Sequence, residues 1–409
     1  MRILHLSWEY PPVMYGGLGR HVHALAENQA ARGDDVVVIT QAASGHPADE
    51  VVKGVRVIRV ARDAPDVADW RERFIEWTFG FNVAVARAGI GLARDWRPDV
   101  VHGHDWLVAQ AAVLVQEAVQ VPFVLTMHAT ESGRQGGVLA TDLARDIDST
   151  EDWEVRRSDA VIVCSDYMRD EVATLFGRAS EGITVIPNGI DPDEWRTTDA
   201  RRRTMRRRYG SPLVVFAGRL EAEKGVQTLL DAMPALRRAV PGVRAVVIGE
   251  GGAERDLRAR ARQRRLGDSV TFLGYVSETD LRSLISAADV AVVPSLYEPF
   301  GFVALEAIVL GAPIVVASTG GLATIVDDGL TGWQFEPGNV PALAGAVRAA
   351  LSDPREARQR ATRARADVLA RYGWPTIAEQ TDAVYRGVAR GRRARRAAAP
   401  CWTILLASN

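Results

Sequence analysis

Two basic side chains on one short loop have the chemistry to hold a diphosphate. Arg219 and Lys224 lie in the segment AGRLEAEKG, which follows the apolar run 213–217 and precedes a helical pattern. A guanidinium fork binds two phosphate oxygens, and an ammonium group adds a compact positive charge. Only two of the 50 basic residues of the chain are lysines, which favours a specific role for Lys224. The alternative is a solvated loop in which these side chains pair with Glu221 and Glu223.

A second loop carries a pair of glutamates. Glu298 follows the apolar run 289–293 in the segment PSLYEPFGF, and Glu306 lies eight residues further on, in the next predicted helix. In a chain rich in acidic residues such a pair also arises by chance. Its position after a strand, however, favours a ligand contact. The turn STGG (318–321) follows the next apolar run and also suits phosphate oxygens.

The first loop of the chain is rich in glycine. Gly16, Gly17 and Gly19 open a predicted helix, where backbone N–H groups can approach an anion. The alternative is a tight turn between a strand and a helix that binds nothing.

Two clusters of histidine and carboxylate also follow predicted strands. His104 and Asp105 lie in HGHDW, and His128 is followed closely by Thr130 and Glu131. A single histidine at a strand end is usually structural. Two such clusters in one half of the chain make a functional role equally plausible.

The positions of these residues depend on a predicted alternation of strands and helices. In the first half the predicted strands are 2–7, 35–40, 99–102, 122–127, 160–165 and 183–187, with additional strands in 51–60, and the predicted helices are 18–32, 106–119, 145–157 and 166–176. After IPNGID the predicted strands are 213–217, 243–248, 269–273, 289–293 and 313–316, and the predicted helices are 225–239, 253–265, 277–287, 302–310, 339–352, 354–370 and 376–389. This alternation is typical of βαβ units around a parallel sheet.

The pattern predicts an α/β protein with two doubly wound, Rossmann-like domains that face each other across a cleft. We expect residues 1–195 to form the first domain and 196–371 the second, because the rhythm breaks in the Arg-rich stretch near 192–212. Ligands of such folds bind beyond the carboxyl ends of the strands, where all the residues named above are expected.

Charge and composition indicate which partners and which compartment to expect. The net charge is −1, which gives no reason to expect nucleic acid as a partner. The two cysteines, Cys164 and Cys401, have no metal or redox spacing, and we expect a cytoplasmic protein without signal peptide or membrane span. For residues 391–409 we expect a disordered basic and apolar tail, with a weak membrane contact as the alternative. The oligomeric state stays open.

The combined motifs resemble glycosyltransferase family 4, which has the two-domain GT-B fold, over essentially residues 1–390. The segments that carry the resemblance are GGLGRH, HDW, TMHA, IPNGID, AGRLEAEKG, EPFG-x7-E and STGG. SWEYPP and HDWLVA are similar to actinobacterial α-1,4-glucosyltransferases that resemble glycogen synthases. By this resemblance, residues 372–390 cross back onto the first domain. The family is retaining, uses no cofactor, and takes a nucleotide-diphosphate sugar (ADP-, UDP- or GDP-linked) as co-substrate.

The resemblance also assigns roles to individual residues. It implies that Arg219 and Lys224 neutralise the donor diphosphate and that Glu298 faces the transferred sugar. Glu306 bonds the nucleotide ribose, and His128 lies near position 6 of the sugar. The remaining implied positions are Asp105 near the reacting centre, Gly16 and Gly17 in the phosphate loop, and Phe300, Gly301, Phe302 and Gly320 at the donor.

One departure and several alternatives accompany this hypothesis. Glycogen synthases of the neighbouring family carry a lysine where this chain has Met14, which weakens the expectation of ADP as the leaving group. No Asp-x-Asp motif follows a predicted strand, so we expect no metal. The acceptor is expected to be an α-1,4-glucan or related glucoside, and the alternatives are a lipid or small-molecule acceptor, a UDP-sugar 2-epimerase of the same fold, or a protein that only binds sugar nucleotides.

Overall fold

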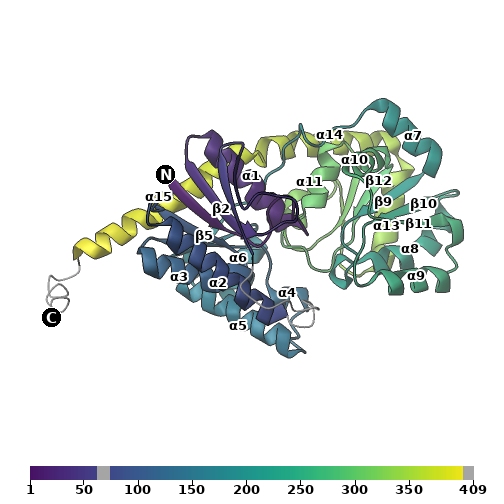
Figure 1. Cartoon of the computed structure of the whole chain (residues 1–409). Helices are drawn as coiled ribbons and strands as arrows, with labels where there is room; N and C mark the ends of the chain where they lie inside the picture. Colours follow the sequence, from purple (N-terminus) through teal and green to yellow (C-terminus); the bar gives the residue numbers. More distant parts are fainter. Residues whose placement is uncertain (62–73, 399–409) are drawn as a thin grey trace, which may run out of the picture.

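The computed structural model describes residues 1–61 and 74–398 and contains two α/β domains side by side (Figure 1). The first domain is built on a sheet with the strand order β3-β4-β2-β1-β5-β6-β7-β8, in which only β3 runs antiparallel to its neighbour. Its strands are β1 (Arg2–Leu6), β2 (Asp35–Gln41), β3 (Asp49–Val52), β4 (Val55–Val60), β5 (Val100–His104), β6 (Phe123–Met127), β7 (Ala160–Val163) and β8 (Ile183–Val185).

Helices cover both faces of this sheet, so its central strands are buried on both sides and consist mainly of β-branched residues. One face is covered by α1 (Gly17–Ala31) and the other mainly by α2 (Phe74–Leu92) and α3 (Ala109–Val119). The remaining helices of this part are α4 (Glu131–Arg134), α5 (Asp142–Arg157) and α6 (Asp166–Phe176), with short 3-10 turns η1 (Trp106–Val108) and η2 (Ser180–Gly182).

The second domain has an all-parallel sheet with the order β11-β10-β9-β12-β13-β14. Strands β9 to β11 are added toward one edge of the sheet and β12 to β14 toward the other, so the strand order reverses between β9 and β12, where ligands of doubly wound sheets bind. The strands are β9 (Leu213–Ala217), β10 (Arg244–Ile248), β11 (Val270–Gly274), β12 (Val290–Val293), β13 (Ile314–Ala317) and β14 (Trp333–Phe335). The helices are α7 (Asp199–Tyr209), α8 (Val226–Ala239), α9 (Glu254–Gln263), α10 (Glu278–Ala287), α11 (Phe302–Val309), α12 (Leu322–Ile325), α13 (Val340–Ser352) and α14 (Pro354–Arg371), with turns η3 (Ala222–Lys224) and η4 (Gly267–Ser269).

The last helix returns to the first domain. Helix α15 (Trp374–Ala398) leaves the second domain and packs on α1, where Ile377 and Tyr385 are fully buried (Figure 1). At the crossing, the backbone N–H of Ile190 donates to the carbonyl of Tyr372 at 2.8 Å. The expected division at 195/196 and 371/372 stays a prediction.

Two features differ from the expectations. The disordered tail was placed too early, because α15 continues through Ala398; the segment RGRRARRAAA contains no helix breaker after Gly391, and Pro400 is the next one. Residues 399–409 lie outside the described part of the chain. Helix α2 was not predicted, because its small and aromatic residues blur the helical period. No helix among the described residues is long and apolar enough to cross a membrane.

Candidate active site

The predicted phosphate-binding loop lies at the carboxyl end of β9. Lys224 is mostly buried, and its Nζ donates to Glu298 Oε2 at 2.9 Å. Arg219 is half exposed, and its Nη2 donates to Glu223 Oε1 at 3.3 Å. Gly225, at φ +70°, lies so close to the loop after β12 that a Cβ would fall 1.8 Å from the carbonyl oxygen of Pro294. This close approach brings the two loops together and with them Lys224 and Glu298.

The loop that carries Glu298 is held by hydrogen bonds to its backbone and side chain. The hydroxyl of Ser295 also donates to Glu298 Oε2, at 3.2 Å. The backbone N–H of Gly321 donates to the carbonyl of Glu298, and a Cβ on Gly320 would lie 1.9 Å from that oxygen. Gly320 therefore fits two loops together in this structure, and its expected contact with the donor stays a prediction.

Glu306 lies on α11 and is buried, but its carboxylate is paired with Arg20 of the first domain. Burial raises the pKa of Glu306, and the guanidinium of Arg20 opposes this effect. Arg20 also lies over the ring of Trp195, with its guanidinium carbon 5.8 Å from the ring centroid. The carboxylate expected to bond the ribose thus joins the two domains in the described state.

The glycine loop at the start of α1 has an internal anion. The backbone N–H groups of Tyr15 and Gly16 donate to Glu9 Oε2 at 2.8 and 3.0 Å. Burial raises the pKa of Glu9, while these N–H groups lower it. A phosphate can use these two donors only after the Glu9 carboxylate turns away, so the predicted phosphate contact requires a rearrangement. Sequence reasoning overlooked Glu9.

Gly17 and Phe302 meet across the domain boundary. A Cβ on Gly17 would lie 2.7 Å from the ring of Phe302, the first residue of α11. Gly301, the N-cap of α11, has φ +117°, which a residue with a side chain rarely adopts. Phe300 is buried, and its ring packs against those of Phe302 and Tyr372. The close packing at Gly17 explains a glycine there without any ligand.

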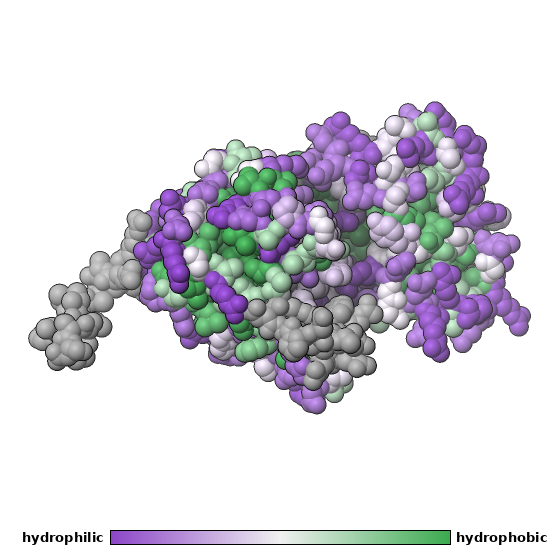
Figure 2. Space-filling view, in the orientation of Figure 1, coloured by the Kyte–Doolittle hydropathy of each residue, from purple (hydrophilic) through white to green (hydrophobic). Residues whose placement is uncertain are grey.

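Further bonds join the domains near the same loop. The hydroxyl of Ser165 donates to the carbonyl of Pro299 at 2.7 Å. The hydroxyl of Tyr297 accepts from the backbone N–H of Thr130 at 3.1 Å and donates to Glu171 Oε1 at 2.9 Å. Figure 2 shows the surface hollowed between the two domains.

On the side of the first domain, Asp105 holds the backbone of the loop that carries His128. Asp105 Oδ1 accepts from the backbone N–H of His128 at 2.7 Å. Asp105 has φ +59°, a strained conformation for a residue with a side chain. Burial raises the pKa of Asp105 to about 6, and the nearby guanidinium of Arg134 lowers it. The structure therefore connects the two residues that were predicted from separate strand ends.

Five of the seven histidines form one buried cluster at the same edge. It consists of His5, His21, His102, His104 and His128, and only His128 is partly exposed. Burial is the main cause that lowers the pKa of each of these rings, to about 4 for His5 and about 3 for His128. Near neutral pH each ring is therefore neutral, with one N–H group and one lone pair.

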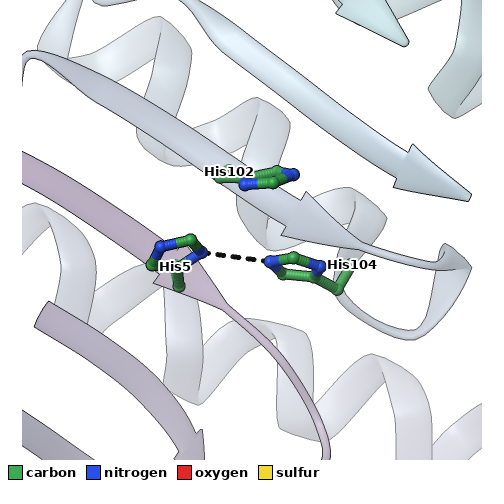
Figure 3. Close-up of side chains that lie close together, drawn as sticks. All are labelled: His5, His102 and His104. Carbon is green, nitrogen blue, oxygen red and sulfur yellow. Dashed lines mark hydrogen bonds between the residues drawn. The ribbon is translucent and has the colours of Figure 1, made fainter. Parts of the chain in front are cut away.

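Two triplets in this cluster have nitrogens close enough to suggest a metal site. In the triplet His5, His102 and His104 (Figure 3), each ring nitrogen has a hydrogen-bond partner within the protein, so no lone pair is free for a metal. In the other triplet, His21 Nε2 has no partner among the described residues. The remaining bonds identify the cluster as a hydrogen-bond network. A signal for this network was present in the sequence, because His102 and His104 lie two positions apart in β5 and so face the same side of the sheet. His5 and His21 were overlooked.

Two further features of the first domain are an exposed aromatic ring and a cavity. The ring of Tyr15 stacks on that of Trp8 with centroids 4.9 Å apart, and Tyr15 is 53% exposed. A cavity of about 1120 Å³ is lined by Arg2, Asp99, Pro122 and Asp159. These residues lie at the starts of the strands, opposite the edge where ligands of parallel sheets bind, so this cavity is not the candidate site.

Comparison with known proteins gives consistent results along the whole chain. The family model described as Glycosyltransferase Family 4 matches residues 15–194, and that described as Glycosyl transferases group 1 matches residues 198–367. The chain is 45% identical to a glycogen synthase of Mycobacterium tuberculosis over 96% of each protein. It is 33% identical to a D-inositol 3-phosphate glycosyltransferase of Xylanimonas cellulosilytica, over 93% of this chain and 94% of that protein.

Solved structures agree on the fold. Sucrose-phosphate synthase from Thermosynechococcus elongatus superimposes with a TM-score of 0.81 at 26% identity, covering 95% of this chain and 99% of that one. The catalytic domain of starch synthase IV from Arabidopsis thaliana, bound to ADP and acarbose, gives a TM-score of 0.78 at 20% identity, with coverage of 95% and 99%. The prediction of two Rossmann-like domains in the GT-B arrangement is confirmed.

Proposed function

The chain belongs to glycosyltransferase family 4 and transfers sugar from a nucleotide-sugar donor, and on this basis we propose that it extends an α-1,4-glucan with glucose, with retention of configuration. The pairing of Lys224 with Glu298 beside Arg219, at the edge of the second sheet, is the observation that carries the proposal for the donor side.

Breaking the bond between sugar and diphosphate leaves negative charge on the departing phosphate. Lys224 and Arg219 supply positive charge where we expect the diphosphate, and preorganised charge of this kind lowers the barrier. Lys224 is held at 2.9 Å from Glu298, so its position is set before the donor binds. Because these side chains can neutralise the leaving group, we propose that the reaction needs no metal ion.

The two glutamates have partners that separate their roles. Glu298 is bonded to Lys224 and Ser295, and Glu306 is paired with Arg20. A covalent retaining mechanism instead uses two carboxylates as nucleophile and acid on either side of one bond. We therefore favour transfer on the face from which the diphosphate departs, with the leaving phosphate accepting the proton of the acceptor hydroxyl.

Two observations support a glucan acceptor. The relative of 45% identity is a glycogen synthase. In addition, the exposed ring of Tyr15, stacked on Trp8 and adjacent to Gly16, offers an aromatic face to the C–H groups of a sugar ring. The D-inositol 3-phosphate glycosyltransferase of 33% identity makes a cyclitol phosphate the second candidate acceptor.

A donor and acceptor screen tests the proposal. The full chain is incubated with ADP-, UDP- and GDP-glucose, with maltoheptaose, with inositol phosphate, or without acceptor, and with and without EDTA. We expect nucleotide release that depends on maltoheptaose and is unaffected by EDTA, with a product whose new linkage is α-1,4 by NMR. Transfer to inositol phosphate with none to maltoheptaose would refute the glucan acceptor, and a β-linked product would refute retention.

A further inference from the structure

A chain of hydrogen bonds leads from the C-terminal helix to His128. It begins on α15 at Asp382, whose carboxylate lies 3.5 Å from the guanidinium of Arg32. Gln29 Nε2 donates to Asp382 Oδ1 at 3.0 Å, and Gln29 Oε1 lies 2.8 Å from His5 Nε2. His5 Nδ1 lies 3.1 Å from His104 Nε2, as Figure 3 shows, and His104 Nδ1 lies 3.4 Å from His128 Nε2.

The direction of each bond follows from its first member. A carboxylate paired with arginine only accepts, so the amide of Gln29 must turn its NH₂ group to Asp382 and its oxygen to His5. His5 then donates through Nε2 and accepts through Nδ1, because a neutral imidazole has one donor and one acceptor. His104 must donate through Nε2 to His5, and its Nδ1 is left to accept from His128.

A side branch is compatible with the same orientation of the Gln29 amide. Gln29 Nε2 also lies 3.4 Å from the hydroxyl of Tyr385, which lies 2.6 Å from His102 Nδ1. Tyr385 can accept from Gln29 and donate to His102, and His102 Nε2 can then donate to Thr126 Oγ1 at 2.7 Å. Every bond in both branches is satisfied with Gln29 in this orientation, and reversing the amide would place its oxygen against the carboxylate of Asp382, with two acceptors face to face.

We propose that Asp382 and Gln29 are positioning residues that fix the tautomer of His128, so that Nε2 carries the proton and Nδ1 presents a lone pair to a hydroxyl of the substrate. The substrate part of this inference rests on the proposed function, whereas the tautomer does not. Which nitrogen of a histidine is protonated is set by the bond that the other one makes. A residue of helix α15 thereby influences His128 through Gln29 of helix α1.

The proposed order of hydrogen bonds requires that every histidine in the chain of bonds is neutral. A protonated imidazole donates through both nitrogens and would interrupt the order. The burial that holds the pKa of His5, His104 and His128 below its usual range therefore keeps the chain directional. The bond between His104 and His128 is the longest of the four, so it is where the order is most easily lost.

The tautomer can be measured directly in the full chain. Protein labelled with ¹⁵N-histidine is studied by NMR, which distinguishes a protonated from an unprotonated ring nitrogen, and His128→Gln identifies the signals of His128. We expect the wild type to show a protonated Nε2 and an unprotonated Nδ1 at His128. The opposite tautomer in the wild type would overturn the proposal.

Variants at Gln29 then test the cause. Gln29→Leu removes the acceptor for His5, and we expect a mixture of His128 tautomers with kcat lowered roughly tenfold to hundredfold and the Kd of nucleotide unchanged. Gln29→Glu should retain the wild-type tautomer and most of the activity. Two adjacent buried carboxyl groups retain a proton between them, so the new side chain can donate to Asp382 and accept from His5.

A matched control separates this role from simple packing. Thr381 is equally buried on α15, but its hydroxyl bonds only to the carbonyl of Ile377 among the described residues. Thr381→Val should lower stability without changing the tautomer of His128. If Gln29→Leu behaves like Thr381→Val, with an unchanged tautomer, Gln29 is only structural and the proposal fails. If the tautomer changes and kcat does not, the network is real but His128 has no role in transfer, which would refute the substrate part.

Discussion

The two sheet edges that face each other are built from opposite kinds of side chain. The edge of the second domain presents charged groups on glycine-shaped loops, with Arg219 half exposed and Lys224 paired with Glu298. The edge of the first domain presents neutral imidazoles, nearly all of them fully buried. A nucleotide sugar has two corresponding parts, since the diphosphate gains charge during transfer and the sugar is a neutral polyol. We therefore propose that charge stabilisation and directional hydrogen bonding fall to different domains.

The strongest test of this division is at the charged edge. Lys224→Ala should lower kcat/KM about 100-fold, because it removes a mostly buried charge next to the leaving group, and Arg219→Ala should lower it at least tenfold. Steady-state kinetics with the best donor provide the measurement. The matched control is Lys53→Ala, which removes the only other lysine, an exposed residue on the turn between β3 and β4 that pairs with Glu27. Normal turnover in both loop variants would remove this loop from the mechanism.

Variants of the two glutamates test whether these residues have separate roles within the second domain. Glu298→Gln should reduce transfer strongly and leave binding of the nucleoside diphosphate nearly intact, since its proposed partner is the sugar. Glu306→Gln should weaken nucleotide binding, because it removes the proposed bonds to the ribose and also the pairing with Arg20. Calorimetric titration with the product nucleotide, beside turnover, separates the two. The reverse pattern would require the roles to be exchanged.

The residues of the charged edge could be predicted from the sequence for a physical reason. Its residues lie on loops directly after strands, and each loop contributes its functional side chains within one short segment. The alternation of β-branched runs with helical patterns therefore located Lys224 and Glu298 and predicted the two domains. The alternative in which Lys224 pairs with Glu223 is not found, since Lys224 pairs with Glu298 and it is Arg219 that pairs with Glu223.

The network at the neutral edge could not be predicted in this way. It joins residues of β1, α1, β5, β6 and α15, and its bonds span up to 356 positions between Gln29 and Tyr385. No local pattern distinguishes such a residue from an ordinary polar side chain on a helix. Arg20 was overlooked for the same reason, because its partner Glu306 lies in the other domain. Glu9 has its partners in its own loop, but these are backbone N–H groups, which no pattern of side chains reveals.

The third prediction concerns the cost of burial at the neutral edge. Burial raises the pKa of Asp105 to about 6 in the folded chain, above its ordinary value, so the folded state binds this proton more tightly than the unfolded state does. The contribution of Asp105 to stability therefore falls as pH rises from about 4 to about 6. Asp105→Asn retains an acceptor for the backbone N–H of His128 and removes this dependence. We expect it to stabilise the protein at pH 7 by about 1–3 kcal/mol while lowering activity.

The measurement compares Tm for the wild type and Asp105→Asn at pH 4.5 and pH 7. The advantage of the variant should be larger at pH 7 than at pH 4.5, where Asp105 is mostly protonated in the folded wild type. An equal difference at both values would show that the Asp105 carboxyl titrates normally.

The smallest expected effect lies where the two edges touch. Gly17 is the first residue of α1 and accepts alanine without backbone strain, but the new Cβ would lie 2.7 Å from the ring of Phe302 in the other domain. Since carbon atoms in contact are separated by about 3.5–4.0 Å, the domains must move apart by roughly 1 Å or the ring must turn. Gly17→Ala should therefore lower kcat about threefold to tenfold, because it misaligns sugar and diphosphate contacts made from opposite domains. Binding of the nucleotide, held mainly by the second domain, should change little.

Gly345→Ala on α13, where a Cβ meets nothing within 4 Å, is the control for a glycine replaced in a helix. The double variant Gly17→Ala/Phe302→Leu relieves the contact and should recover most of the loss, as a coupled pair does in a double-mutant cycle. A loss that persists in the double variant would mean that Gly17 acts on the donor itself through its own backbone, and the meeting of the two edges would not be what limits transfer.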